Sequence, residues 1–304
     1  MVLYRSRIIR VLYYQIAGLL LALQGSGEKS KERMTEYMLP LAKEGEHCCD
    51  YRVNIHRCGL DEMPHVEGEN RLLAGSMWKI AENMPKTIYR GVIGMEEEVA
   101  AILQLTDTGA EVFVLVLDEE LQDLRDYSCL SFALEDFALR KKRMVVHASC
   151  VAVNGKAVVF VAPSGTGKST HTGLWTKHIS EAVCINDDTP VLRLDRPEAV
   201  YACGSPWSGK TMLNTNQEFP LAAVVLLRRG EENKLTPVSG IDAYARILGE
   251  TRKLPFKDSM ENAATLAAEL MERVPIYDFT CDVSEAAVRE AIKVLGEDLT
   301  LSDE

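Results

Sequence analysis

The sequence predicts an α/β domain built on a mixed sheet, preceded by a smaller β-rich α+β module. Residues 158–171 (VVFVAPSGTGKSTH) read as a buried strand, a glycine-rich loop and the start of a helix, and further strands and helices alternate beyond them. The first 116 residues instead hold short segments that alternate in polarity or are rich in β-branched residues. We therefore divide the chain into a β-rich module, residues 1–116, and a larger domain, residues 117–304.

Composition excludes several classes of protein. The chain has 304 residues, of which 47% are hydrophobic and 26% charged, an ordinary balance for a globular protein of two domains. Its formal charge of −11 argues against a broad nucleic-acid interface, which needs a basic face. The eight cysteines form no CxxC pair and no cluster at zinc spacing, so we expect reduced thiols in a cytoplasmic protein.

The N-terminus carries a targeting ambiguity. Three arginines in the first ten residues precede an uncharged run, residues 11–25, which superficially resembles a signal peptide. The run is too short to span a membrane, and the polar Tyr13-Tyr14-Gln15 interrupts it. We expect a first strand there and no association with a membrane.

Short segments with strand character recur through the first module, at residues 50–56, 76–80, 87–93 and 111–117. His47, His56 and His65 lie on separate segments without a carboxylate pattern, which favours surface or core histidines over metal ligands. Apolar residues at helical intervals then predict a helix over residues 119–142. Its basic end, residues 140–143, suits a helix C-terminus better than a nucleic-acid patch.

Asn154-Gly155 joins two apolar runs, residues 145–153 and 156–162, and this dipeptide is the strongest short signal for a β-hairpin. In a two-residue turn Val153 faces Lys156, and counting back along both strands puts His147 opposite Ala162. The register therefore predicts an imidazole at the mouth of the glycine-rich loop, unless a bulge shifts it. The alternative is a histidine that merely ends an edge strand.

The loop itself has the composition of a phosphate-binding loop. Gly165 and Gly167 allow backbone N–H groups to turn inward around a polyphosphate, Lys168 reaches the terminal phosphates, and Ser169 offers a hydroxyl to Mg²⁺. A helix over residues 168–178 adds its positive N-terminal end. Ala162 stands where the first glycine of the pattern is usual. The predicted nucleotide-binding residues are Ser164, Gly165, Thr166, Gly167, Lys168, Ser169 and Thr170.

An acidic pair follows the next predicted strand, residues 182–185. Asp187 and Asp188 come directly after that strand, where one carboxylate can hold Mg²⁺ and the other can accept the proton of an attacking hydroxyl. A turn or a helix cap is the alternative explanation for an aspartate at this place. We favour Asp187 as the base, and Asp188 with Ser169 as metal ligands.

A second loop, residues 204–210 (GSPWSGK), follows a predicted hairpin formed by residues 191–194 and 200–203. Trp207, Ser208 and Lys210 are its candidate substrate contacts, and a plain surface loop is the alternative. Farther along, the pattern predicts strands at 222–227 and 276–281, helices at 240–252, 262–273 and 284–295, and a frayed acidic tail at 296–304.

Together, the segments HASCVAVNGKAVVFVAPSGTGKST, INDD and GSPWSGK resemble the catalytic domain of the HPr kinase/phosphorylase family, which is related in fold to ATP-dependent phosphoenolpyruvate carboxykinase. The resemblance covers residues 140–290. It implies a P-loop kinase domain with a mixed sheet, in which Lys168 and Ser169 bind phosphates and Mg²⁺. Asp187 and Asp188 would divide the work of base and metal ligand, and His147 would help to line the γ-phosphate end.

The sequence lacks the glycine-rich, arginine-containing segment with which that family docks HPr. It is more similar to the dispersed HPr-kinase-like proteins that carry HAS, GTGKSTHTGLW, INDD and GxPWSGK. This implies an ATP- and Mg²⁺-dependent kinase that phosphorylates a serine-type hydroxyl on a small metabolite or peptide, and a homo-oligomer is compatible with it. The alternatives are carboxykinase-like chemistry and a nucleotide-binding sensor without catalysis.

Overall fold

The computed structural model describes residues 11–40, 48–67, 77–92, 95–116 and 119–299. The chain forms two compact units, Met1–Leu134 and Glu135–Glu304, which are described separately below. The division falls inside helix α2 (Glu119–Arg140), whereas the sequence placed it before that helix, at 116/117. The helix therefore contributes residues to both units.

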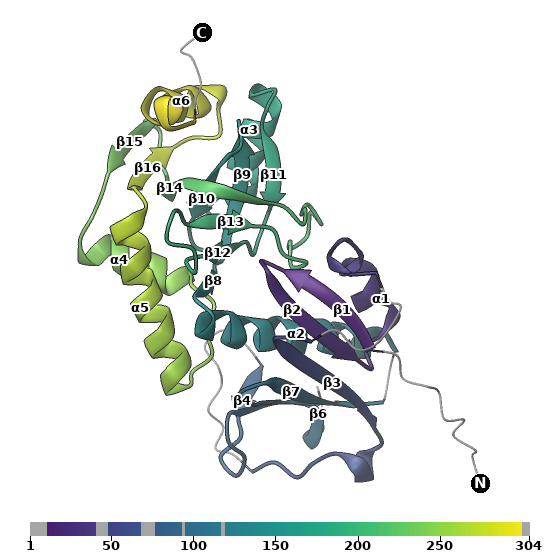
Figure 1. Ribbon diagram of the computed structural model, residues 1–304. Coiled ribbons are helices and arrows are strands. Elements are labelled where there is room, and N and C mark those ends of the chain that lie inside the picture. Colours follow the sequence, from purple (N-terminus) through teal and green to yellow (C-terminus); the bar gives the residue numbers. More distant parts are fainter. Residues whose placement is uncertain (1–10, 41–47, 68–76, 93–94, 117–118, 300–304) are drawn as a thin grey trace. The chain divides into compact units, whose positions relative to one another are not determined.

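The N-terminal unit contains a seven-stranded mixed sheet in the order β1-β2-β3-β7-β6-β5-β4 (Figure 1). Its strands are β1 (Val11–Ile16), β2 (Leu19–Gln24), β3 (Tyr51–Cys58), β4 (Trp78–Ile80), β5 (Thr87–Val92), β6 (Met95–Leu105) and β7 (Gly109–Leu115). The β2–β3 and β3–β7 pairs are parallel, and the other neighbours are antiparallel. The described residues of this unit also form helix α1 (Glu28–Arg33), the first part of α2 and two single 3₁₀ turns, Thr35–Tyr37 and Leu60–Glu62.

Two expectations for this unit are corrected. The run 11–25 is a hairpin of two strands, because Ala17 and Gly18 turn the chain with positive φ angles of 48° and 73°. An alanine at such a position gives no turn signal. The second correction is β6, which the sequence did not predict; its first residues include three consecutive glutamates, a poor signal for a strand.

Ionic and polar contacts connect the part of α2 that belongs to this unit to its strands. Arg57 of β3 pairs with Asp126, whose carboxylate is fully buried and also accepts a hydrogen bond from the backbone N–H of Gly27 at 2.9 Å. His56 pairs with Glu111 at 2.6 Å, and the exposed His65 lies 3.2 Å from Glu67. These two histidines thus make ordinary polar contacts; His47 lies outside the described residues.

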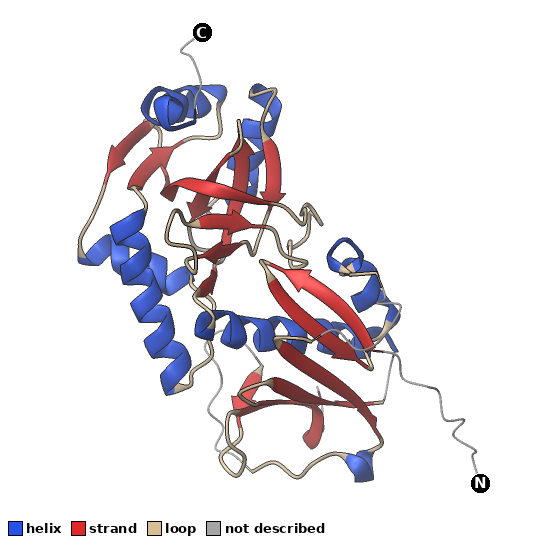
Figure 2. Cartoon of the chain, in the orientation of Figure 1, coloured by secondary structure: helices blue, strands red, loops and turns tan. Residues whose placement is uncertain are grey.

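The C-terminal unit contains a nine-stranded mixed sheet, with the main path β11-β9-β10-β14-β13-β12-β8 and with β16 between β14 and β15 (Figure 2). Its strands are β8 (Arg143–Val145), β9 (Ala148–Val153), β10 (Lys156–Val161), β11 (Val183–Asn186), β12 (Val191–Arg193), β13 (Tyr201–Cys203), β14 (Glu218–Arg229), β15 (Lys234–Pro237) and β16 (Ile276–Cys281). Its helices are α3 (Lys168–His178), α4 (Ile241–Glu250), α5 (Lys257–Arg273) and α6 (Glu285–Leu299).

Helices cover both faces of this sheet. Alternate residues of β10 enter two separate cores: Val159 packs with residues of α4 and α5, and its neighbour Phe160 packs with residues of α3 and α6. The central strands are therefore buried on both sides, which explains their nearly continuous apolar sequence.

The predicted hairpin and its register are confirmed. Asn154 and Gly155 have φ angles of 49° and 78°, the two positive values that a type I′ turn requires. The ladder begins at Val153↔Lys156 and runs without a bulge to Ala148↔Val161. The apolar run 145–153 is nevertheless two strands, because the chain leaves the ladder at Val146 and His147 between β8 and β9.

Most other elements of this unit lie near their predicted places, although α5 begins at Lys257, five residues before the predicted start, and three further differences are found. Strand β15 was not predicted, since its four residues KLTP carry little strand signal. Strand β14 is longer than the predicted 222–227 and pairs along its length with different neighbours. Helix α6 continues to Leu299, so residues 296–299 are helical rather than frayed; residues 300–304 lie outside the described part.

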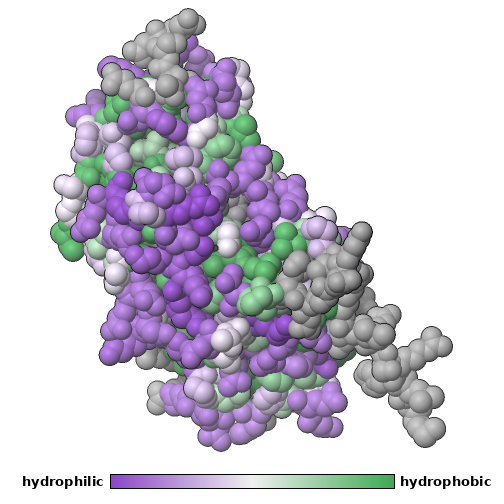
Figure 3. Space-filling model, in the orientation of Figure 1, coloured by the Kyte–Doolittle hydropathy of each residue, from purple (hydrophilic) through white to green (hydrophobic). Residues whose placement is uncertain are grey.

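Hydrophilic side chains cover most of the described surface on the face shown in Figure 3, and hydrophobic residues are exposed there only in smaller areas. Among the described helices, none combines the length and the apolar character that a membrane crossing requires. The eight cysteines are all free, and five of them are buried.

His171, in α3, is a titratable group in the apolar core between the sheet and helices α3 and α6. It is 3% exposed, and its Nε2 accepts a hydrogen bond from Trp175 Nε1 at 3.1 Å. Phe160 and Phe279 make T-shaped contacts with its ring at centroid distances of 4.7 and 5.3 Å. Burial lowers its pKa from 6.5 to about 4, because the charged imidazolium would lose its hydration there.

This lowered pKa predicts an acid-sensitive fold. Between about pH 6.5 and pH 4 the unfolded chain binds a proton at His171 that the folded chain does not, so stability falls as the pH falls through this range. We expect the wild type to lose about 3 kcal/mol more free energy of unfolding between pH 7 and pH 4 than His171→Gln, which retains an acceptor for Trp175. Urea titrations at a series of pH values measure the difference; parallel pH profiles would contradict it.

Candidate functional site

Three sequence features, the glycine-rich loop, the acidic pair and His147, lie along one edge of the C-terminal sheet. Strands β10, β11 and β14 all point the same way, since β9 is antiparallel to both β10 and β11, and β14 is parallel to β10. The glycine-rich loop therefore leaves β10 at the edge where the acidic pair leaves β11. His147 precedes β9, which runs the opposite way, and so lies at the same edge.

The glycine loop, residues 162–167, connects β10 to α3. Gly165 and Gly167 have φ angles of 80° and 113°, and a Cβ atom built on either would meet nothing within 4 Å. Their backbone conformation, rather than lack of room, therefore requires glycine. Helix α3 begins at Lys168, directly after Gly167, so its first N–H groups lie at the end of the loop.

Lys168 is folded back over the loop and is 6% exposed. Its Nζ donates hydrogen bonds to the carbonyl oxygens of Ala162 (2.7 Å) and Pro163 (3.4 Å) and lies 3.1 Å from Nε2 of His147. Burial lowers the pKa of this ammonium group, and the nearby Glu250 and Asp188 carboxylates partly oppose the shift. The ammonium is thus held by uncharged acceptors that an anion can replace.

His147 is oriented by Glu250, a residue that carries no motif and was not expected at the site. Its Nδ1 lies 2.7 Å from Glu250 Oε2, and its backbone N–H donates to the Glu250 carbonyl at 2.8 Å. Since a protonated Lys168 only donates, we assign Nε2 as the acceptor and Nδ1–H as the donor to Glu250. The predicted imidazole is therefore present at the loop, next to Ala162 and Lys168.

The two aspartates face different neighbours. Asp187 is 5% exposed and hydrogen-bonds to Ser169 and Thr211; burial is the largest influence on its pKa, which is raised despite these hydrogen bonds. The Asp188 side chain is 33% exposed, with Oδ1 3.8 Å from His147 Nε2 and with Oδ2 accepting a hydrogen bond from Thr189 at 2.6 Å. Both aspartates thus lie within the group of polar residues around Lys168.

Asn186, which precedes the pair, is fully buried and holds two loops together. Its Oδ1 accepts hydrogen bonds from the backbone N–H groups of Asp188 (3.0 Å) and Thr189 (2.6 Å). Its Nδ2 donates to the carbonyl oxygens of Ser205 (2.9 Å) and Trp207 (3.3 Å). A single amide therefore sets the position of the acidic pair relative to residues 204–210.

Residues 204–210 pack against the acidic pair, but their side chains are not all accessible. Trp207 is 6% exposed and Ser208 is 1% exposed, and the Ser208 hydroxyl accepts a hydrogen bond from Asn214 at 2.8 Å. The indole is therefore packed in the protein rather than open as a wall for a substrate. Lys210 is exposed. A substrate contact by any of the three residues stays a prediction.

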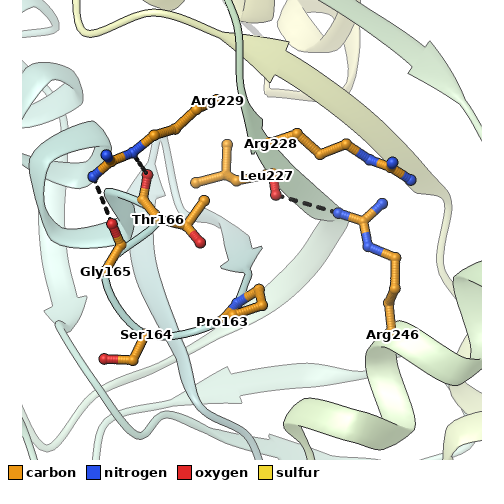
Figure 4. Close-up of a pocket in the computed structure, with 8 residues that line it drawn as sticks. All are labelled: Pro163, Ser164, Gly165, Thr166, Leu227, Arg228, Arg229 and Arg246. Carbon is orange, nitrogen blue, oxygen red and sulfur yellow. Dashed lines mark hydrogen bonds between the residues drawn. The ribbon is translucent and has the colours of Figure 1, made fainter.

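A pocket of about 490 Å³ lies on the side of the glycine loop next to β14, away from the acidic pair (Figure 4). Its lining comprises Pro163, Ser164, Gly165, Thr166, Leu227, Arg228, Arg229 and Arg246. Arg229 donates to the carbonyl oxygens of Gly165 (2.5 Å) and Thr166 (2.9 Å). Arg246 donates to the Leu227 carbonyl (3.2 Å) and pairs with Asp278. None of these arginines was expected at the site from the sequence.

The donors around Lys168 suit a cation that arrives with phosphates. Among the described residues there is no group of three or more His, Cys, Asp or Glu side chains that could hold a metal on their own. Mg²⁺ usually takes one or two carboxylates and completes its shell with water and phosphate oxygens. The hydroxyl of Ser169 and the carboxylates of Asp187 and Asp188 fit that pattern.

The contact between Gly209 and Asp188 predicts a specific displacement. Gly209 has a φ of 64°, and an added Cβ would lie 3.0 Å from Cβ and 3.2 Å from Cγ of Asp188. Gly155, at the far end of the β9–β10 hairpin, has a φ of 78° and an open Cβ position. We expect Gly209→Ala and Gly155→Ala each to lose about 1–2 kcal/mol of stability from backbone strain, but only Gly209→Ala to shift the Asp188 carboxylate. Urea denaturation and crystal structures of both variants test this; an unmoved Asp188 in Gly209→Ala would count against the packing described.

Comparison with known proteins yields little. No family model matches the chain, and no curated protein matches it. Among solved structures, the Hpr(Ser) kinase/phosphatase from Coxiella burnetii matches with a TM-score of 0.30 and 10% sequence identity, over 51% of this chain and 97% of that chain. A likeness this weak carries no inference, so the functional conclusion depends on the chemistry of the residues described above.

Proposed function

We propose that this protein is an ATP- and Mg²⁺-dependent kinase that transfers the γ-phosphoryl group to a hydroxyl of a small metabolite or peptide. One observation carries the proposal: the lysine of a glycine loop, the serine that follows it and two aspartates converge at one edge of the sheet. Phosphoryl transfer needs a binding site for the phosphates, a cation, and an acceptor for the hydroxyl proton. These residues supply groups for all three.

Phosphates would bind at residues 164–170, where the loop and the N-terminus of α3 present backbone N–H groups. In the structure Lys168 donates to Ala162 and lies beside His147. A bound phosphate would replace these neutral acceptors, and charge-assisted hydrogen bonds are stronger than the ones they replace. His147, fixed by Glu250, would remain beside the ammonium and limit where it can point.

Charge explains why a divalent cation would be needed. Three carboxylates, from Glu250, Asp188 and Asp187, and one guanidinium, from Arg252, act on Lys168. With the lysine included, the cluster is net negative and would repel a triphosphate that came without a cation. Ser169 and Asp188 would hold Mg²⁺, which would neutralise charge on the transferred group.

Asp187 would accept the proton of the acceptor hydroxyl. Burial raises the pKa of its carboxyl, which makes the carboxylate a stronger base than an exposed aspartate. Its hydrogen bond to Ser169 also permits the reverse division of roles, with Asp187 near the metal and Asp188 as the base. We assign the base to Asp187 because its raised pKa suits that role. The variants Asp187→Asn and Asp188→Asn distinguish the two divisions of roles.

The alternatives receive less support. Carboxykinase chemistry requires basic residues for a dicarboxylic acid at the transfer end; Arg252 lies near Lys168 there, but the pocket with three arginines lies on the β14 flank of the loop. A sensor that only binds nucleotide has no need for a buried aspartate with a raised pKa. Consumption of ATP that depends on oxaloacetate would support the first alternative.

The base assignment predicts different defects in two variants. With the acceptor identified from extracts, we expect Asp187→Asn to lower turnover by about 10²–10⁴-fold and to leave ATP affinity within about tenfold, because one proton acceptor is removed. Asp188→Asn should instead raise the Mg²⁺ concentration that gives half-maximal activity. Steady-state kinetics across a Mg²⁺ titration measure both.

Glu285→Gln, on the exposed surface of α6, is the control and should match the wild type in both measurements. If Asp187→Asn turns over normally, the base assignment is wrong. If instead Asp188→Asn lowers turnover and Asp187→Asn raises the Mg²⁺ concentration for half-maximal activity, the reverse division of roles is correct.

A further inference from the structure

We propose that the pocket beside the glycine loop, formed with Arg228 and Arg246, binds the nucleoside half of the phosphoryl donor. The donor is then a nucleoside triphosphate rather than inorganic polyphosphate or pyrophosphate. This inference rests on the proposed function, since it assigns the part of the donor that the glycine loop does not hold. For clarity we call the space lined by the residues of Figure 4 the arginine pocket.

The order of the strands places this pocket at the correct end of a bound donor. Along the sheet edge the order is β11, β9, β10, β14. The acidic pair follows β11, two strands from β10, which corresponds to about 10 Å at the usual strand spacing. Arg228 is near the end of β14, the strand next to β10 on the opposite side. A donor with its phosphates on the loop and its reacting end at Asp187 would therefore extend its other end toward the arginines.

The chemistry of the pocket suits a nucleoside better than a second phosphate chain. Arg228 and Arg246 both bind Asp278, which neutralises part of their charge. Arg246 is fixed on its other side by the Leu227 carbonyl, so its planar group is held in place. The Arg228 side chain is 57% exposed and contacts Asp278 through Nε, at 3.0 Å. Planar guanidinium groups stack on bases and donate hydrogen bonds to sugar and phosphate oxygens.

Arg229 links this pocket to the phosphate-binding part of the site. Its guanidinium group holds the carbonyl oxygens of Gly165 and Thr166, as Figure 4 shows. Loss of Arg229 would therefore disturb the loop as well as the pocket, and a variant at this position could not separate the two halves of the donor. The test uses Arg228 and Arg246, whose guanidinium groups bind Asp278 and the Leu227 carbonyl rather than the backbone of the glycine loop.

A dicarboxylic acid is a less suitable occupant of the arginine pocket. Asp278 would repel its carboxylates, since it is the shared partner of both arginines. The pocket also lies on the side of the loop away from the acidic pair, where the acceptor has to meet the proton acceptor. Oxaloacetate is nevertheless included in the test as a probe.

Calorimetric titrations with one triphosphate that carries a nucleoside and one that lacks it distinguish the halves of the site. The probes are Mg²⁺ with the non-hydrolysable ATP analogue AMPPNP and Mg²⁺ with inorganic tripolyphosphate. We expect Arg246→Ala and Arg228→Ala each to weaken AMPPNP binding by about tenfold or more, with tripolyphosphate binding changed less than twofold. Arg289→Ala, an exposed arginine of α6, is the matched control and should change neither.

Equal losses of affinity for AMPPNP and tripolyphosphate, or no loss of affinity for either, would overturn the proposal. So would binding of oxaloacetate by the wild type that disappears in Arg228→Ala and Arg246→Ala. If Arg246→Ala does not fold, Arg228→Ala still provides the test, because Asp278 keeps Arg246 as its partner. Failure of the proposed function has a different signature: the wild type would bind neither probe. Binding of tripolyphosphate by a wild type that shows no preference for AMPPNP would contradict this inference alone.

Discussion

The turn at Asn154-Gly155 sets the register on which the candidate site depends. Because side chains alternate between the faces of a strand, a slip by one residue would exchange the two cores that β10 separates. It would also move the start of β9 along β10, and with it His147 away from Lys168. A local turn preference thus fixes the distance between a histidine and a lysine 21 residues apart in the sequence.

Around that hairpin, buried polar groups are positioned by one another. Glu250 holds His147, which lies beside Lys168, and Asn186 fastens the acidic pair to residues 204–210. Buried charges are costly unless they are paired or hydrogen-bonded, and each unsatisfied group adds to that cost. Three carboxylates, from Glu250, Asp188 and Asp187, lie near Lys168 and Arg252, so a metal ion that arrives with a polyphosphate would offset their excess negative charge and stabilise the folded protein.

Local signals were sufficient for part of this site. The glycine loop, the limits of α3 and the hairpin register follow from short stretches of sequence, because φ angles, caps and turn types are local properties. Glu250 could not be found in this way, since it lies 103 residues from its partner and carries no motif. The arginine pocket was missed for the same reason: strand order brings Arg228 to the loop, and no pattern in one sequence reveals strand order. Trp207 was predicted to contact a substrate from a loop rich in Gly and Ser, yet its side chain is buried and Asn186 binds the backbone of that loop.

The central claim is that the residues at this sheet edge transfer a phosphoryl group to a hydroxyl. The most direct measurement incubates the protein with Mg²⁺ and γ-labelled ATP in a metabolite and peptide extract and identifies the labelled product by mass spectrometry. We expect a phosphate ester that forms with the wild type and not with Lys168→Ala. If the label appears only in inorganic phosphate, or if the Lys168 variant forms the same ester at the same rate, the account is wrong.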